Sequence, residues 1–283
     1  MRGLAIADLD ALRRKIAALE KRPVLAEGAA VAAQRPGRPV AANDTRPRVE
    51  ELLAIPPGVL HEVFVDEQRN GTAGLGFALG LARGLIGGGR QAILYLQLAE
   101  QAQEMGVPYA LGLQRFGIDP DKLILARTNS LTELLWAMEE AVACRAVAGV
   151  IADIHGHPKA LDFTASRRLS LRSSAGGSSV FLIRYGRERE ASAAKLRWRI
   201  EPELSAGQPF DPQAPGPPRY LVEIEKRRLA GKTARAETMR LTLDWTENGF
   251  VPAEDGSRTG QSYAAPAPRP VVAALGDRYA QAG

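Results

Sequence analysis

The sequence predicts an α/β fold, in which a mainly parallel sheet is flanked by helices and carries antiparallel edge strands toward the C-terminus. From Val59 onward, short apolar segments alternate with amphipathic ones, which is typical of strand–helix units. Residues 147–154 (VAGVIADI) are apolar almost throughout, as expected for a strand buried on both faces. After Tyr185 the segments alternate polar and apolar residues, which indicates antiparallel strands with one solvated face.

Composition is that of a water-soluble globular protein. The chain has 283 residues, 45% hydrophobic residues and a net charge of +5, which is enough for one α/β domain with tails. A single cysteine, Cys144, excludes an intramolecular disulfide and fits a reducing compartment. No apolar run reaches the length of a membrane span, and the first residues lack a signal-peptide core. We therefore expect a cytoplasmic protein with no membrane partner.

Both ends of the chain differ in character from the middle. Residues 1–21 predict an amphipathic helix, residues 22–57 a Pro-rich linker, and residues 251–283 a flexible Pro/Ala-rich tail. The helix carries a narrow apolar stripe of the coiled-coil type. It either docks a partner or a second copy of the chain, or folds back on the domain. The residues of the stripe are Leu9, Leu12, Ile16 and Leu19.

The core domain is expected over residues 58–250, and local patterns predict its helices and strands. Residues 131–142 repeat apolar positions every three or four residues, as a helix requires, and Asn129 or Ser130 caps it. Pro108 interrupts another helical stretch. Parallel strands are expected at 59–65, 91–98, 122–126, 147–154 and 179–185, helices at 75–86, 100–116, 131–142 and 162–174, antiparallel strands at 195–201, 219–226 and 238–244, and a loop at 202–218.

Residues 66–74 (DEQRNGTAG) join the first strand to the first core helix, where a nucleotide-binding α/β protein places its phosphate loop. Such a loop needs glycines to cradle phosphates, a Lys to reach them and a Ser or Thr for magnesium. On that template the second Gly position falls on Asn70, the Lys position on Gly71 and the Ser/Thr position on Thr72. Only Thr72 fits, and residues 22–121 contain no Lys. The loop is therefore predicted to be degenerate.

Two acids follow strands at positions that an ATPase would use, namely Glu100 and Asp153. Phosphoryl transfer depends on neutralising phosphate charge, so acids without a cation repel ATP. We therefore group Asp153 with Asn70, Gly71 and Thr72 as the residues of the degenerate nucleotide loop. We expect no catalytic residue and no cofactor. His155 and His157, two residues apart without further ligands, are not expected to hold a metal.

Basic residues concentrate in the second half of the core. Residues 155–240 hold 17 Lys or Arg and 9 Asp or Glu, a local balance of +8. Basic loops neutralise nucleic-acid phosphates, whereas the interleaved Glu188 and Glu190 favour a solvated charged face instead. Both interpretations stay open. The candidate DNA contacts are Lys159, Arg184, Arg187, Arg189 and Lys195.

The order of several motifs over residues 55–250 resembles the RecA recombinase core. The strand GVLHEVFV with the helix after it is similar to that family's phosphate-loop unit. WAMEEAVACRAVAGVIADI is similar to its helix and second acidic strand, and Asp153 matches the magnesium-associated Asp. The remaining resemblance lies in QAILYLQLAE, LGLQRFGIDPDKLILAR, LDFTASRRLSLRSSAGGSSVFLIRYG and SAAKLRWRIE.

Within that superfamily the chain resembles the ImuA family of damage-inducible mutagenesis proteins, through its missing Lys and the segments LLWAMEEAVACRAVAGVIAD, SAAKLRWRIEPE and RYLVEIEKRRLAG. The resemblance implies a non-catalytic adaptor of SOS-induced error-prone translesion DNA synthesis at the nucleoid. Such an adaptor bridges an ImuB-like polymerase homologue and an error-prone DnaE-type polymerase. RecA is a further candidate partner, DNA contact would be weak or partner-assisted, and self-association stays open.

Two other functions remain as alternatives. The same degenerate fold resembles SulA, the SOS-induced cell-division inhibitor that binds FtsZ. An additional N-terminal helix and a basic antiparallel section exceed what a small inhibitor needs. The second alternative is a RecA-like DNA-dependent ATPase, which the missing lysine disfavours.

Overall fold

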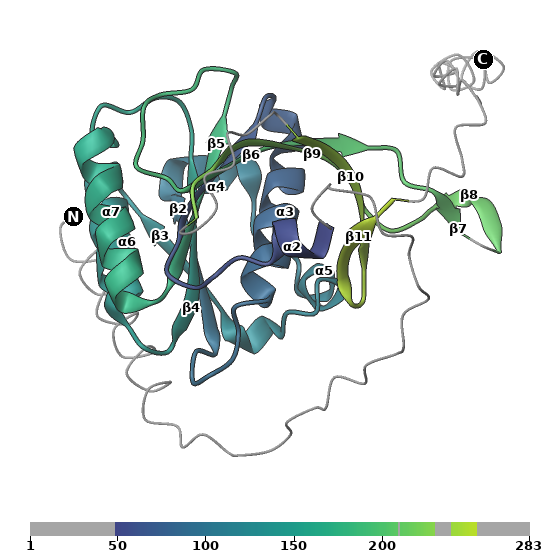
Figure 1. Cartoon of the computed structure of the whole chain (residues 1–283), viewed down its shortest axis with the longest axis horizontal. Helices are drawn as coiled ribbons and strands as arrows, with labels where there is room; N and C mark the ends of the chain where they lie inside the picture. The colour runs from purple at the N-terminus through teal and green to yellow at the C-terminus, as the bar shows by residue number, and fades with distance from the viewer. Residues whose placement is uncertain (1–48, 209, 230–238, 254–283) are drawn as a thin grey trace, which may run out of the picture. The chain divides into compact units, whose positions relative to one another are not determined.

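The computed structural model of the chain describes residues 49–208, 210–229 and 239–253. A nine-stranded sheet in the order β11-β10-β9-β6-β1-β5-β4-β2-β3 runs through these residues (Figure 1). The expected mainly parallel sheet with helices on both sides and antiparallel strands toward the C-terminus is confirmed. The predicted N-terminal helix with Leu9, Leu12, Ile16 and Leu19 lies outside the described residues, as do residues 22–48 of the predicted linker 22–57 and residues 254–283 of the predicted tail 251–283.

The parallel part of the sheet is centred on β1 (Leu60–Val65). Its neighbours on the two sides are β5 (Ser179–Tyr185) and β6 (Leu196–Glu203), and both run parallel to it. Beyond β5 follow β4, β2 and the edge strand β3, also parallel. These three strands span Val147–Ile154, Ala92–Leu98 and Leu123–Thr128.

The expectation that β6 belongs only to the antiparallel section is wrong. β6 pairs parallel with β1 on one side and antiparallel with β9 (Arg219–Arg227) on the other. Its alternating pattern arises because Leu196, Trp198 and Ile200 face the core while the opposite face carries charged side chains. Alternation therefore reports burial of one face and not the direction of the neighbouring strand.

The outer strands curl around one helix (Figure 1). β10 (Met239–Thr246) pairs antiparallel with β9 on one side and with β11 (Gly249–Pro252) on the other. These three strands lie against α3 (Gly71–Arg83). The Phe250 ring lies 5.2 Å from Phe77 of α3 and 4.8 Å from Trp245. The segment 202–218, expected as a loop, contains the short hairpin of β7 (Gly207–Gln208) and β8 (Asp211–Pro215).

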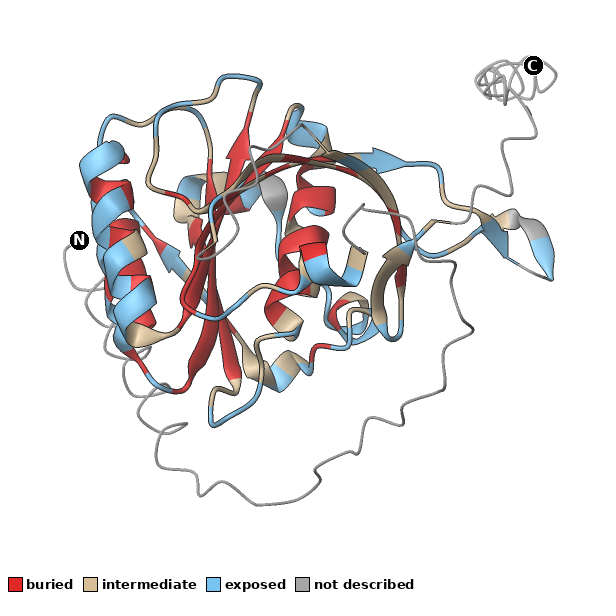
Figure 2. Ribbon diagram, in the orientation of Figure 1, coloured by how far each residue is buried: buried red, intermediate tan, exposed pale blue. Residues whose placement is uncertain are grey.

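Helices cover the two faces of the sheet with separate apolar clusters (Figure 2). α3 and α5 (Ala110–Arg115) contribute to one cluster, and α6 (Leu131–Ala143) and α7 (Phe163–Gly176) to the other. The predicted helix 100–116 is divided at Pro108 into α4 (Ala99–Met105) and α5. Among the described helices the longest has 14 residues, and none has both the length and the apolar character of a membrane span.

Polar side chains set the start of the two helices on the second face. The Ser130 hydroxyl accepts a hydrogen bond from the Glu133 amide at 3.2 Å, and the Asp162 carboxylate accepts one from the Ala165 amide at 2.7 Å. Each acceptor satisfies one of the amides that a first helical turn leaves free. The predicted cap at Asn129 or Ser130 is therefore formed by Ser130.

Both predicted boundaries of the core differ from the observed ones. α2 (Val49–Leu53) lies within the segment expected as linker, and its Leu52 is buried in the α3 cluster. Arg227 fixes this helix by donating hydrogen bonds to the carbonyls of Leu52 at 2.7 Å and Glu51 at 3.1 Å. At the other end, β11 continues to Pro252, two residues beyond the expected boundary.

A buried histidine lies in the centre of the sheet. His61 on β1 stacks on Phe181 at 4.4 Å between ring centroids, and its Nδ1 accepts a hydrogen bond of 3.2 Å from the Trp198 indole. Burial lowers the pKa of His61 from its ordinary 6.5 to about 3. His61 is therefore neutral in the folded protein and binds a proton more readily in the unfolded chain.

The depressed pKa of His61 predicts that the free energy of unfolding already decreases at pH values above those at which carboxylates titrate. Because the folded-state pKa is depressed, stability should fall by about 1.4 kcal/mol per pH unit as pH drops from 6.5 toward 4. His61→Gln keeps an acceptor for Trp198 but does not titrate, so its stability should vary less over this range. Urea unfolding at stepped pH measures both slopes. A wild-type slope in His61→Gln contradicts the assignment.

A pair of helical glycines tests the contact between α3 and the outer strands. A Cβ atom at Gly80 would lie 2.6 Å from Phe250 and 2.7 Å from Trp245, whereas one at Gly112 in α5 meets nothing within 4 Å. Gly112→Ala should stabilise the protein by about 0.5–1 kcal/mol through helix propensity. Gly80→Ala should lose about 1–3 kcal/mol through overpacking, less the same helical gain. Thermal unfolding compares the two variants, and equal stabilisation would contradict the packing.

Candidate functional site

The segment that joins β1 to α3 does not form a phosphate cradle. Gln68–Asn70 is a 3-10 turn, and α3 begins directly at Gly71. Asn70 has a φ of −92° and Gly71 one of −55°, and no residue between Asp66 and Thr72 has a positive φ. An anion nest needs residues that alternate between right-handed and left-handed backbone, so the amide groups here do not converge on a phosphate.

A small cavity lies beside this turn, at the carboxyl ends of the parallel strands. It has a volume of about 180 Å³ and is lined by the first turns of α3, the ends of β2 and β4, and residues 106–109. In sheets of this kind, the carboxyl edge of the strands is the usual place for ligands. Of the residues predicted for the degenerate loop, Gly71, Thr72 and Asp153 meet at this cavity; Asn70 precedes it in the turn.

Asp153 is the acidic centre of the cavity. One of its oxygens accepts a hydrogen bond of 3.2 Å from the Tyr95 hydroxyl, which in turn accepts one of 2.9 Å from the Gln97 amide. Burial first, and then the Asp153 charge, raises the pKa of Tyr95 and of Tyr185, so both phenols keep their protons at neutral pH. Glu100, the other predicted acid, is exposed and is not part of the cavity lining.

The two loop histidines contact acids without forming a metal site. His155 Nε2 lies 3.4 Å from Asp153, and His157 Nδ1 lies 3.3 Å from Glu190. Within the part of the chain that the structure describes, no three His, Cys, Asp or Glu side chains are grouped closely enough to hold a metal ion.

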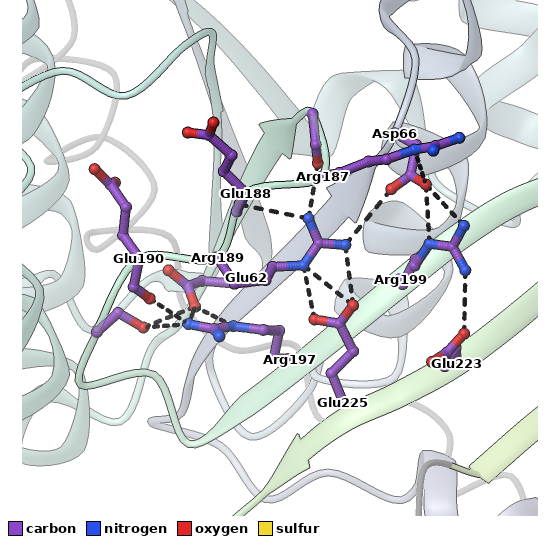
Figure 3. Close-up of polar contacts among 12 residues, drawn as sticks. Glu62, Asp66, Arg187, Glu188, Arg189, Glu190, Arg197, Arg199, Glu223 and Glu225 are labelled. Atoms are coloured by element: carbon purple, nitrogen blue, oxygen red, sulfur yellow. Dashed lines mark hydrogen bonds and ion pairs between the residues drawn. The ribbon is translucent and has the colours of Figure 1, made fainter.

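A second polar region covers the face of β1 opposite α3 (Figure 3). Residues 186–195, here called the crossover loop, link the parallel strands β5 and β6 and pass across β1, which lies between them. The guanidinium of Arg189 stacks 3.9 Å above the Phe64 ring and forms a bidentate ion pair with Glu225 of β9, with a closest distance of 2.8 Å. The loop thus takes the place of a covering helix.

Asp66, the first residue after β1, gathers arginines from two segments (Figure 3). Its carboxylate lies 2.7 Å from Arg199 of β6, 3.4 Å from Arg187 and 3.5 Å from Arg189. The hydrogen bond from Arg199 is the largest influence and holds the pKa of Asp66 below its ordinary 3.8. The Asp66 side chain is only 8% exposed, so these contacts are poorly screened by solvent.

The candidate DNA contacts differ in how accessible they are. Arg184 is buried and donates hydrogen bonds to Gly156 O at 3.2 Å and to Glu190 at 3.1 Å, and Arg189 is engaged with Glu225. The Arg187 side chain is 82% exposed, Lys159 is exposed, and Lys195 is partly buried. DNA contact by these residues remains a prediction.

The sequence count of basic residues missed the acids that neutralise them. Glu62 and Asp66 belong to β1 and to the turn after it, outside the counted segment, yet Glu62 lies 2.8 Å from Arg197. Glu223, which the count does include, pairs with two of the counted bases: it lies 3.1 Å from Arg199 and 3.2 Å from Arg240. An alternation of charged residues on one face of β6 and β9 is the signal that could have indicated this pairing.

Fold and site together define an α/β protein with a mainly parallel sheet, in which the turn after β1 has neither a lysine nor a phosphate cradle. No family model matches the chain. Two relatives, both called Protein ImuA, come from Caulobacter vibrioides strains NA1000 / CB15N and ATCC 19089 / CIP 103742 / CB 15. Each is 36% identical over 228 residues, which cover 73% of this chain and 89% of the relative. The chain belongs to the ImuA family.

Similarity to solved structures is lower. The RadB recombinase superposes with a TM-score of 0.43 at 15% sequence identity, covering 70% of this chain and 92% of the RadB chain.

The ion pairs of Asp66 with Arg187, Arg189 and Arg199 predict that the protein loses stability when the Asp66 carboxylate is neutralised. Asp66→Asn should cost about 1.5–3 kcal/mol at pH 7, because it removes charge-assisted hydrogen bonds from a nearly buried site. Since the pKa of Asp66 is lowered on folding, this contribution is present above pH 3.8 and disappears as pH falls further. The wild-type and variant stabilities should therefore converge in acid.

Glu188→Gln is the matched control, because the Glu188 side chain is 84% exposed and its contact with His157 is 3.7 Å long. It should change the free energy of unfolding by less than about 0.5 kcal/mol. Urea unfolding of the three proteins measures the differences. An Asp66→Asn protein as stable as Glu188→Gln would show that the arginines hold their positions without this carboxylate.

Proposed function

We propose that this chain is a non-catalytic adaptor of SOS-induced error-prone translesion DNA synthesis. In this role it bridges an ImuB-like polymerase homologue and an error-prone DnaE-type polymerase near a stalled primer end. Membership of the ImuA family supports the assignment to damage-induced mutagenesis. The partners follow from the resemblance described above, and RecA is a further candidate partner.

One observation carries the non-catalytic part of the proposal: the strand–turn–helix unit is intact while its phosphate-binding chemistry is gone. β1, α3 and their apolar contacts are well packed, but the turn between them is a 3-10 helix that lacks a lysine. Transfer of a phosphoryl group depends on positioning and charge neutralisation, and here Asp66 places a negative charge at the start of the turn. An ATPase would have to supply both from elsewhere.

Partner contacts are assigned to the ends of the chain. The apolar stripe of Leu9, Leu12, Ile16 and Leu19 has the spacing of a helix that docks in a groove or pairs with another helix. Tethering by a Pro-rich linker would let this helix reach a partner while the core stays in place. DNA contact through exposed members of the basic set, Arg187 and Lys159, would then be assisted by the assembled partners.

Replacing Leu12 and Ile16 together by Asp tests this proposal. The variant should abolish damage-induced mutagenesis in cells and leave the unfolding midpoint of the core unchanged, because the charges disrupt docking and not the sheet. Mutation frequency after DNA damage and a tagged pull-down with mass spectrometry provide the readouts. Recovery of FtsZ without a polymerase would contradict the adaptor function and favour the alternative, an inhibitor of cell division.

Calorimetry with Mg–ATP is the matching control for the non-catalytic assignment. The full chain should give no saturable heat at millimolar nucleotide. Saturable binding that Thr72→Ala removes would favour the ATPase alternative.

A further inference from the structure

The cavity beside the degenerate turn has an acidic floor and an apolar rim. At the floor, Asp153 is 3% exposed, and Tyr95 and Gln97 lie against it. At the rim, Val107 and Tyr109 are 58% and 70% exposed. These two side chains offer apolar area at the mouth of the pocket on which a partner protein could pack.

Two acceptor atoms at the floor lack hydrogen-bond partners. Within the described residues, Asp153 Oδ1 and Gln97 Oε1 are buried without one. The Tyr95 hydroxyl donates to Asp153 Oδ2, and His155 Nε2 lies 3.4 Å from Oδ1. Among the described residues, no Lys or Arg forms an ion pair with this carboxylate. A buried carboxylate without a Lys or Arg partner is costly, so this floor favours a ligand with a positive charge and several donors.

Size limits the ligand further. About 180 Å³ is less than the roughly 300–1,000 Å³ of pockets that hold small molecules or cofactors. It matches the volume of one long side chain. Lys and Arg carry three and five N–H donors and no acceptor, and their aliphatic stems suit an apolar entrance.

We propose that this cavity receives one Lys or Arg side chain of a partner protein, with apolar residues beside it packing on Val107 and Tyr109. The inferred contact places the cationic head group between Asp153 and Gln97, at the carboxyl ends of β4 and β2. It rests on the adaptor function proposed above and gives that function a specific anchor point. Thr72, which lines the same cavity, offers a further hydroxyl acceptor.

Peptide selection on the full chain tests the anchor. Short random peptides displayed on phage should be enriched in sequences with one Lys or Arg next to apolar residues. Replacing that arginine by citrulline, its neutral analogue, should weaken binding about tenfold or more, because a buried charge pair loses its cation. This comparison changes only the peptide and is independent of how variants of the protein fold.

On the protein side, Asp153→Asn should weaken the selected peptide by a similar factor. Glu100→Gln is the matched control, since Glu100 is an exposed acid at the start of α4 and not part of the cavity lining; it should leave the affinity within about twofold. Thermal unfolding verifies that both variants are folded. Selected peptides without a shared basic residue, or binding that Asp153→Asn does not affect, would overturn the proposal.

Calorimetry with Mg²⁺ alone and with Mg–ATP tests whether a metal ion or a nucleotide occupies the cavity instead of a side chain. Saturable binding that Asp153→Asn removes would assign the cavity to a metal or a nucleotide and refute the side-chain anchor. Failure of the anchor is distinguishable from failure of the adaptor function. Peptide binding does not depend on mutagenesis, and loss of mutagenesis in the Leu12 and Ile16 variant does not depend on the cavity.

Discussion

The carboxylate of Asp66 joins the central strand β1 to β6 and to the crossover loop through its ion pairs with arginines. Two parallel strands, β5 and β6, flank β1, so the chain must return across the face of β1 to connect them. Without a helix in that crossover, the Phe64 ring is covered by the guanidinium of Arg189. Asp66 and Glu225 hold Arg189 in place, and the low exposure of these groups gives their charges more effect than surface pairs have.

The same carboxylate also sets the charge at the turn between β1 and α3. Asp66 stands at the first position of the turn where a phosphate would approach, and its charge is committed to Arg199 and Arg189. The turn is a 3-10 helix that α3 follows directly, so its amide groups point along the helix axis. The turn thus combines an acid that is engaged by arginines with a backbone that has no anion nest.

Much of the fold could be predicted because local chemistry specifies it. Residues 147–154 are apolar on both faces, and Ser130 ends a polar stretch before an apolar helix; the strand and the cap follow from these patterns. The direction of β6 could not be predicted, because alternation is the same beside a parallel or an antiparallel neighbour. The charge pairing was equally hidden, since Asp66 and Arg199 are 133 residues apart and their meeting depends on strand order.

Helix α3 is closely packed on two sides, and this limits how it can move. A Cβ atom at Gly74 would lie 2.6 Å from Val65 in the sheet, and one at Gly80 would lie 2.6 Å from Phe250 in the outer strands. Gly74 and Gly80 lie about 120° apart around the helix axis, so the sheet and the outer strands contact two different sides of α3. With backbone this close to its neighbours on two sides, movement of α3 toward the sheet or toward the outer strands requires those neighbours to move as well.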